Sequence, residues 1–110
     1  MIIESQKGKK VYSDGNETEL NMLKIAQKYP EDLSQDFIAQ NNNYTINNTF
    51  SSVRRNILNW YPFREGSSVL EIGAGMGAVT GLLCDKCKSV TAIEMNELRA
   101  DIIRARYPHR

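Results

Sequence analysis

Three glycines and one acid form the part of the sequence whose residue types and spacing suggest chemistry. Gly73, Gly75 and Gly77 follow the apolar run Val69–Ile72, and Glu94 ends a second run. Glycine allows sharp turns and close approach of the backbone to a ligand. A carboxylate about 20 residues after the first glycine can accept hydrogen bonds from both hydroxyls of a ribose. The unit is typical of half of a nucleotide-binding crevice.

An acid inside the first strand separates two classes of nucleotide ligand. Glu71 stands two positions before Gly73 in a strand that is otherwise apolar. We expect its carboxylate to point into the crevice, where it repels a pyrophosphate and suits a cationic sulfonium or ammonium group. Ala78 also fits the last position of the G-x-G-x-x-G/A pattern of dinucleotide-binding folds. Glu71 therefore favours S-adenosylmethionine, and a dinucleotide is the alternative.

These residues resemble motifs I and II of the class I S-adenosylmethionine-dependent methyltransferases. The matching segments are Glu71-Ile72-Gly73-Ala74-Gly75-Met76-Gly77 and Ala92-Ile93-Glu94-Met95. The resemblance implies that Glu71, Gly73 and Gly75 line the methionine end of the cofactor. It also implies that Glu94 holds the ribose hydroxyls and that Met95 packs against the adenine ring. The predicted cofactor-binding residues are Glu71, Gly73, Ala74, Gly75, Gly77, Glu94 and Met95.

Each acidic or sulfur-containing residue in this set also has a purely structural interpretation. Glu71 can be satisfied by nearby backbone N–H groups, because a buried carboxylate needs a partner. Glu94 can cap the helix that follows it, and Met95 can fill the core.

Length, composition and charge describe an ordinary globular domain. The chain has 110 residues, of which 41% are hydrophobic and 25% are charged, so we expect one soluble domain. A formal net charge of +1 gives no electrostatic reason to expect a nucleic acid, and we predict that nucleic acid is an unlikely partner. No apolar run can span a bilayer and no signal peptide is recognised, so we expect a cytoplasmic location and no membrane partner.

Two cysteines raise the question of a metal or redox site. Cys84 and Cys87 form one C-x-x-C pair, but zinc would need two further ligands and the only histidine is His109. We therefore expect reduced thiols and no metal site.

Helices and strands must position these residues. Apolar spacing and helix breakers predict helices over residues 17–29, 31–40, 49–60 and 96–107, and strands over 68–72 and 89–94. In the third helix, Val53, Ile57 and Trp60 form one apolar stripe. Tyr44 and Tyr61 are expected in the core or at its rim, with contact to a ligand as the alternative. Met1–Tyr12 is expected as extended edge structure.

The expected fold class is α/β, in which N-terminal helices precede the first β-α-β-α half of a Rossmann-like methyltransferase sheet. We predict an N-terminal helical cap region at residues 1–48 and a truncated S-adenosylmethionine-binding domain at residues 49–110. The methyltransferases that the chain resembles use seven strands, and only two are recognised here. Both strands would then have bare edges, so we expect a fragment that forms a homodimer or higher assembly. No residue is identified as catalytic.

The methyl acceptor is the least specified part of the prediction. The passage R-x-N-I-L-x-W-Y-P-F-x-E-G-x-S-V-L-E-I-G resembles bacterial methyltransferases associated with sugar-transfer proteins, which implies a small-molecule or glycan acceptor. The ribosomal-RNA adenine dimethyltransferases are an alternative, although they usually carry proline where Ala74 stands and an upstream Q-N-F-L-like segment that Asp36–Asn41 does not match. An NAD(P)- or FAD-dependent oxidoreductase domain and a non-catalytic dimerisation module are further alternatives.

Overall fold

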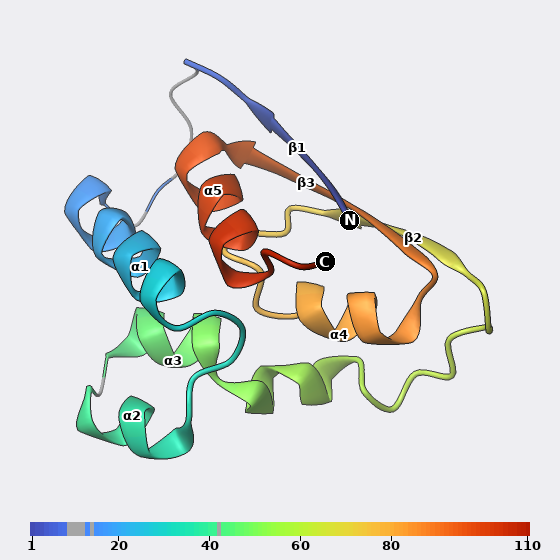
Figure 1. Cartoon of the computed structure of the whole chain (residues 1–110), viewed down its shortest axis with the longest axis horizontal. Coiled ribbons are helices and arrows are strands. Elements are labelled where there is room, and N and C mark those ends of the chain that lie inside the picture. The colour runs from blue at the N-terminus through green and yellow to red at the C-terminus, as the bar shows by residue number, and fades with distance from the viewer. Residues whose placement is uncertain (9–12, 14, 42) are drawn as a thin grey trace.

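The protein folds as a small parallel β-sheet with helices packed against it (Figure 1). The computed structural model describes residues 1–8, 13, 15–41 and 43–110. In chain order the elements are β1 (Ile2–Gln6), α1 (Asn16–Lys28), α2 (Gln35–Gln40), α3 (Tyr44–Phe50), the 3-10 helix η1 (Ser52–Ile57), β2 (Ser68–Ile72), α4 (Thr80–Lys86), β3 (Ser89–Asn96) and α5 (Glu97–Arg106). The α/β class and the β-α-β-α order of residues 68–106 are confirmed.

Three parallel strands form the sheet in the order β1-β3-β2. In the register of β2 and β3, Glu71 is opposite Ala92 and Ile72 is opposite Ile93. Parallel strands end at the same edge of a sheet. The glycine turn after Ile72 and the carboxylate of Glu94 therefore lie at one edge.

The first strand corrects the expectation of a two-stranded unit with two bare edges. Ile3 pairs with Ala92, and Glu4 with Ile93, so β1 covers the edge of β3 that is not paired with β2. This pairing joins the first residues to residues near 90, and a local sequence pattern does not reveal such a distant partner. Residues 9–12 of the expected extended segment lie outside the described residues. Self-association stays a prediction.

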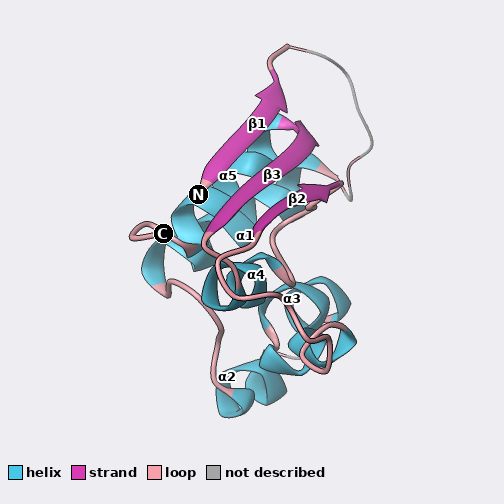
Figure 2. Ribbon diagram, turned by 90° about the vertical axis from the view of Figure 1, so that its right-hand side faces the viewer, coloured by secondary structure: helices cyan, strands magenta, loops and turns pink. Residues whose placement is uncertain are grey.

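Figure 2 shows the sheet in front of α1 and α5, with α4 below the strands, so α1 and α5 lie on one of its faces. Side chains alternate between the two faces of a strand. Leu70 and Ile72 point to the other face and are 55% and 76% exposed. Val69 and Glu71, which alternate with them along β2, are half-buried. Among the described residues, the sheet is therefore covered on one side.

The predicted helix over residues 49–60 is wrong. The α3 helix ends at Phe50, and the Ser51 hydroxyl accepts a hydrogen bond from the Val53 N–H as a 3-10 helix begins. In the described structure the expected apolar stripe is exposed: Val53 is 59%, Ile57 51% and Trp60 73% accessible. Core packing is also wrong for Tyr44 and Tyr61, which are both exposed.

Helices α1 and α5 pack along each other, and α2 and α3 add side chains to the same core. Met22 and Ala26 from α1 meet Ile102 from α5 in a buried cluster. Within the described ranges, no helix is long and apolar enough to cross a membrane.

The pairing of β1 with β3 can be tested by the stability of two isoleucine variants, one on each face of β1. Ile3 packs against the cluster of Ala92, Ile103 and Tyr107, whereas Ile2 on the opposite face is 57% exposed. Truncating a half-buried isoleucine is expected to cost about 1–3 kcal/mol. Ile3→Ala should therefore lower the urea midpoint clearly more than Ile2→Ala. Equal midpoints in the two variants would show that β1 is not packed on the helices in solution.

Candidate cofactor site

The glycine turn between β2 and α4 is built from three residues in left-handed backbone conformations. Gly73, Gly75 and Gly77 have φ angles of 72°, 60° and 82°, which side chains disfavour. A Cβ atom on Gly73 or Gly75 would meet nothing within 4 Å, whereas one on Gly77 would lie 3.3–3.5 Å from side chains of α5. Space for a ligand therefore lies above Gly73 and Gly75, and Gly77 serves close packing.

Glu94 lies beside this turn, as its position at the end of β3 predicts. Its Oε2 accepts a hydrogen bond of 2.8 Å from the Gly75 N–H, and its Oε1 accepts one of 2.9 Å from the Asn96 N–H. A carboxylate has about four acceptor positions, so two remain for other donors. The structure thus brings the predicted ribose-binding acid and the glycine turn together, and Glu94 also supports the start of α5.

Ala74 faces the interior. It is 8% exposed and packs with Ala92, Ile103 and Tyr107. The Gly73 and Ala74 N–H groups both donate to the Ile93 carbonyl, at 2.9 and 3.1 Å. A proline at this position would lack one of these donors.

Glu71 has its partner in the first residue of α4. The Thr80 hydroxyl, which is fully buried, donates to Glu71 Oε2 at 2.7 Å. Burial raises the pKa of the Glu71 carboxyl, and the hydrogen bond from Thr80 acts in the opposite direction. A side-chain hydroxyl, rather than a run of backbone N–H groups, satisfies this acid. Met95 is 47% exposed and is not core filler.

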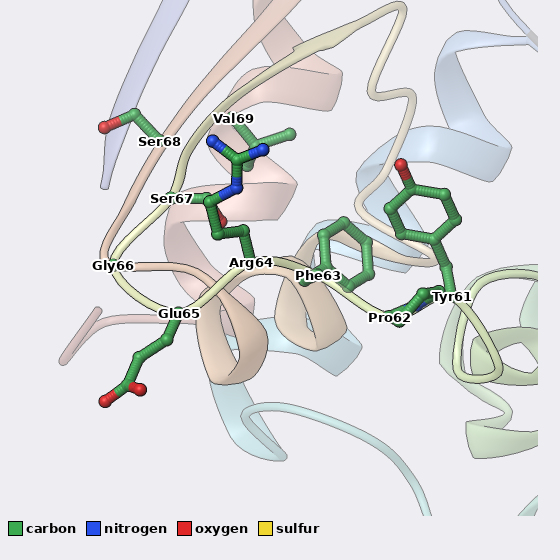
Figure 3. A pocket seen from close by; sticks show the side chains of 9 residues that line it. All are labelled: Tyr61, Pro62, Phe63, Arg64, Glu65, Gly66, Ser67, Ser68 and Val69. Carbon is green, nitrogen blue, oxygen red and sulfur yellow. The ribbon is translucent and has the colours of Figure 1, made fainter.

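A surface pocket of about 670 Å³ lies at the opposite end of β2. The segment from Tyr61 to Val69, which leads into the strand, forms its lining (Figure 3). None of the predicted cofactor-binding residues takes part in it, so we do not assign the pocket to the cofactor.

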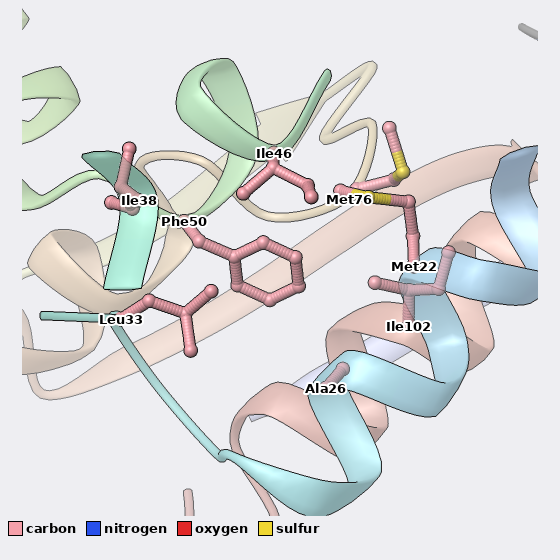
Figure 4. Packing of buried hydrophobic residues seen from close by; sticks show 8 residues of the cluster. All are labelled: Met22, Ala26, Leu33, Ile38, Ile46, Phe50, Met76 and Ile102. Carbon is pink, nitrogen blue, oxygen red and sulfur yellow. The ribbon is translucent and has the colours of Figure 1, made fainter. Parts of the chain in front are cut away.

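The turn is also held from below by residues that the sequence did not single out. Met76 inserts into the cluster of Met22, Ile46, Phe50 and Ile102 (Figure 4). The Arg106 guanidinium donates from Nη1 to the carbonyl oxygens of Met76 and Gly77. Residue type and place in the last turn of α5 do not separate Arg106 from the exposed Arg104, and an arginine is not expected to be buried.

Cys84 and Cys87 are free thiols. Burial raises the pKa of the Cys84 thiol, which disfavours the reactive thiolate. In the part of the chain that the structure describes, no group of three His, Cys, Asp or Glu side chains is placed to hold a metal ion.

A parallel β-α-β unit with a glycine turn and an acid on the neighbouring strand defines a nucleotide-binding α/β protein of Rossmann type. The family model described as ribosomal RNA adenine dimethylase matches residues 23–108. The chain belongs to this family, whose methyl donor is S-adenosylmethionine.

Two curated relatives are both named ribosomal RNA small subunit methyltransferase A. The protein from Prosthecochloris aestuarii is 36% identical over 87 residues, and the one from Chlorobium phaeobacteroides is 32% identical over 92 residues. Each match covers 79% of this chain and 31% of the relative. The chain thus spans about a third of the length of these relatives. No solved structure matches.

These findings overturn two expectations about partners. The preference for a small-molecule or glycan acceptor is wrong, and so is the expectation that nucleic acid is an unlikely partner, since the matching family and relatives are named for ribosomal RNA. The physical error was to use bulk charge. A net charge of +1 on a segment that covers 31% of its relatives does not describe the charge of a whole RNA-binding surface.

The family match also includes a segment that resembles the expected Q-N-F-L pattern. Gln35-Asp36-Phe37-Ile38 retains the glutamine and the phenylalanine and lies within the matched residues. A comparison that begins at Asp36 is displaced by one residue and misses it. In the structure this segment starts α2, where the Ser34 hydroxyl accepts from the Phe37 N–H and Ile38 is 6% exposed.

The raised pKa of Glu71 predicts a pH-dependent stability. The folded chain holds this proton more tightly than the unfolded chain does. Its stabilising contribution is therefore fully present below the ordinary pKa of 4.5 and is lost as the pH rises through the higher folded-state pKa. Glu71→Gln removes the titration and retains an acceptor for Thr80, so its stability should fall less over this range.

Urea midpoints measured from pH 4.5 to about pH 7 check this expectation. Glu65→Gln, at an exposed position of the loop before β2, is the matched control for loss of one carboxyl group. A Glu71→Gln variant with the same pH slope as the wild type would contradict the assignment.

Proposed function

We propose that this chain carries the cofactor-binding part of an S-adenosylmethionine-dependent methyltransferase that acts on adenine in small-subunit ribosomal RNA. The observation that carries the proposal is the family match over residues 23–108, which spans the glycine turn, Glu94 and the helices that support them. The names of both relatives support the small ribosomal subunit as the source of the RNA. The family match favours a methyltransferase over the oxidoreductase alternative.

The geometry of the turn fits the proposed cofactor. Gly73 and Gly75 leave open space where side chains would stand, and Glu94 keeps acceptor positions next to them. We propose that Glu94 accepts from the ribose hydroxyls and that the exposed Met95 packs against the adenine ring. The methionine end of the cofactor would lie against Glu71 and against the turn from Gly73 to Gly77, beneath which Ala74 is buried.

When bound, S-adenosylmethionine supplies a methyl group made electrophilic by its sulfonium centre. The chain's own residues provide position and electrostatics. Glu71 and Glu94 place negative charge near a cationic ligand, and the desolvation of Glu71 strengthens this attraction when the carboxylate is ionised. An adenine amine is a weak nucleophile, so the main contribution to the rate is alignment of the two reactants in line.

The proposed division of the chain assigns residues 1–48 to the helical cap region and residues 49–110 to cofactor binding. Contacts from the first part reach the second at defined points. Glu19 of α1 pairs with Arg99 of α5 at 2.6 Å, and Asp32 pairs with Arg106 at 3.0 Å. The cap region therefore braces α5, which lies under the glycine turn.

A segment exchange tests the proposed acceptor. Residues 23–108 of this chain are placed in the Prosthecochloris aestuarii relative instead of its own matching segment. The chimera is expected to transfer methyl groups to adenine in small-subunit ribosomal RNA, measured by mass spectrometry of the digested RNA. The same chimera with Glu94→Ala is the matched control. A folded chimera that binds S-adenosylhomocysteine and methylates no adenine would refute the proposal that adenine in ribosomal RNA is the acceptor.

Cofactor binding by the chain itself is expected to be weak and to depend on Glu94. One wall of a pocket buries only part of a ligand, and affinity follows the buried surface. Titration with S-adenosylhomocysteine, followed through the amide resonances of Gly73, Gly75 and Gly77, should give saturation above the micromolar range. Glu94→Ala should weaken binding by about 1–3 kcal/mol. Submicromolar binding, or an unchanged constant in the variant, would contradict these expectations.

A further inference from the structure

A fully buried arginine lies beneath the glycine turn. Arg106, at the end of α5, is 0% exposed. Its Nη1 donates to the Met76 carbonyl at 3.0 Å and to the Gly77 carbonyl at 2.6 Å, and its Nη2 donates to Asp32 Oδ1 at 3.0 Å. The guanidinium carbon lies 4.9 Å from the centre of the Phe50 ring. The charge is therefore placed between backbone oxygens, a carboxylate and an aromatic face.

Stability alone does not explain this side chain. Removing a charge from water costs several kcal/mol, and well-packed apolar residues often replace buried ion pairs without loss. Among the described residues, the buried Arg106 Nε has no hydrogen-bond partner, so the desolvation of Arg106 is only partly offset. The distinctive property of the guanidinium is its rigid fork of donors, which fixes the direction of the groups that it binds.

Both backbone carbonyl oxygens that Arg106 binds belong to the turn. The Tyr107 hydroxyl donates to the same Gly77 carbonyl at 3.1 Å, and the Tyr107 ring packs so closely that a Cβ on Gly81 would lie 2.8 Å from it. On the other side, Glu94 holds the Gly75 N–H at 2.8 Å. The peptide groups between Gly75 and Gly77 are thus held from two sides.

We propose that Arg106 is a positioning residue that holds the cofactor turn in its binding conformation through the carbonyls of Met76 and Gly77. This inference rests on the proposed function, in which the turn binds S-adenosylmethionine. Arg106 also links the turn to the preceding helices. It pairs with Asp32 and lies over the Phe50 ring of α3, and Phe50 packs in the same cluster as Met76 (Figure 4).

Three variants separate the fork from charge and volume. Arg106→Met retains an unbranched chain and removes all donors, Arg106→Lys retains the charge without the fork, and Tyr107→Phe removes one donor to Gly77. Arg99→Met is the matched control. Arg99 lies on the same helix as Arg106, but its ion pair is with Glu19 of α1, away from the turn. Urea titration gives the folded fraction of each variant, and each variant is compared with the wild-type chain under conditions in which both are folded to the same extent.

The first readout does not need a cofactor. Hydrogen exchange of the Gly75 and Gly77 amides, relative to the core amide of Ala92, is expected to speed up about tenfold or more in Arg106→Met, since hydrogen bonds to a charged donor are lost. Arg106→Lys should lie between this variant and the wild type, and Arg99→Met should leave the ratio unchanged. If Arg106→Met fails to fold, Arg106→Lys and Tyr107→Phe carry the comparison.

The second readout is affinity for S-adenosylhomocysteine in the amide titration. Arg106→Met is expected to weaken it about tenfold or more, with no comparable loss in Arg99→Met. Wild-type exchange and affinity in folded Arg106 variants, or equal losses in Arg99→Met, would overturn the assignment. A wild-type chain that binds no S-adenosylhomocysteine would refute the proposed function instead, while the exchange ratios would still decide the role of Arg106.

Discussion

Parallel pairing of β2 with β3 is the constraint on which the rest of the site depends. The register that sets Ile72 opposite Ile93 brings the turn after one strand and the acid at the end of the other to the same edge. The Ile93 carbonyl then accepts from both Gly73 and Ala74, and Glu94 reaches the Gly75 N–H. A shift of one residue would turn every side chain of β2 to the opposite face. It would also remove these contacts.

The second requirement is a support that holds the glycine turn in one conformation. Glycine adopts the left-handed φ angles of the turn readily, but it loses more conformational entropy on folding than other residues do. Two charged pairs join α1 and the segment after it to α5. Glu19 pairs with Arg99 in the first turn of α5. Asp32 pairs with Arg106 at the end of this helix, where Arg106 also donates to the Gly77 carbonyl. The pair at the end of α5 is therefore the one that reaches the glycine turn.

The parts that were predictable from sequence are those whose determinants are close together along the chain. The glycine spacing predicted the turn, and the apolar runs predicted β2 and β3, because backbone conformation and strand burial are local properties. The stripe of Val53, Ile57 and Trp60 failed because apolar spacing predicts a helix only where the apolar face is buried, and in the described structure these three side chains are exposed. The pairing of β1 and the burial of Arg106 join residues far apart in the chain, and no local pattern encodes them.

The same distinction explains why the donor of the methyl group was predictable while the acceptor was not. The predicted cofactor contacts fall between Glu71 and Met95, and their chemistry is the same whichever nucleophile receives the methyl group. An acceptor is distinguished by shape and electrostatics over a larger surface. The net charge of this chain carries little information about such a surface when the chain spans 31% of its relatives. Similarity along residues 23–108 extends beyond the glycine turn and Glu94 to α2 and its Gln35–Ile38 segment, and this longer match supports the proposed acceptor. The contacts at the glycine turn are therefore compatible with several methyl acceptors and do not by themselves specify one.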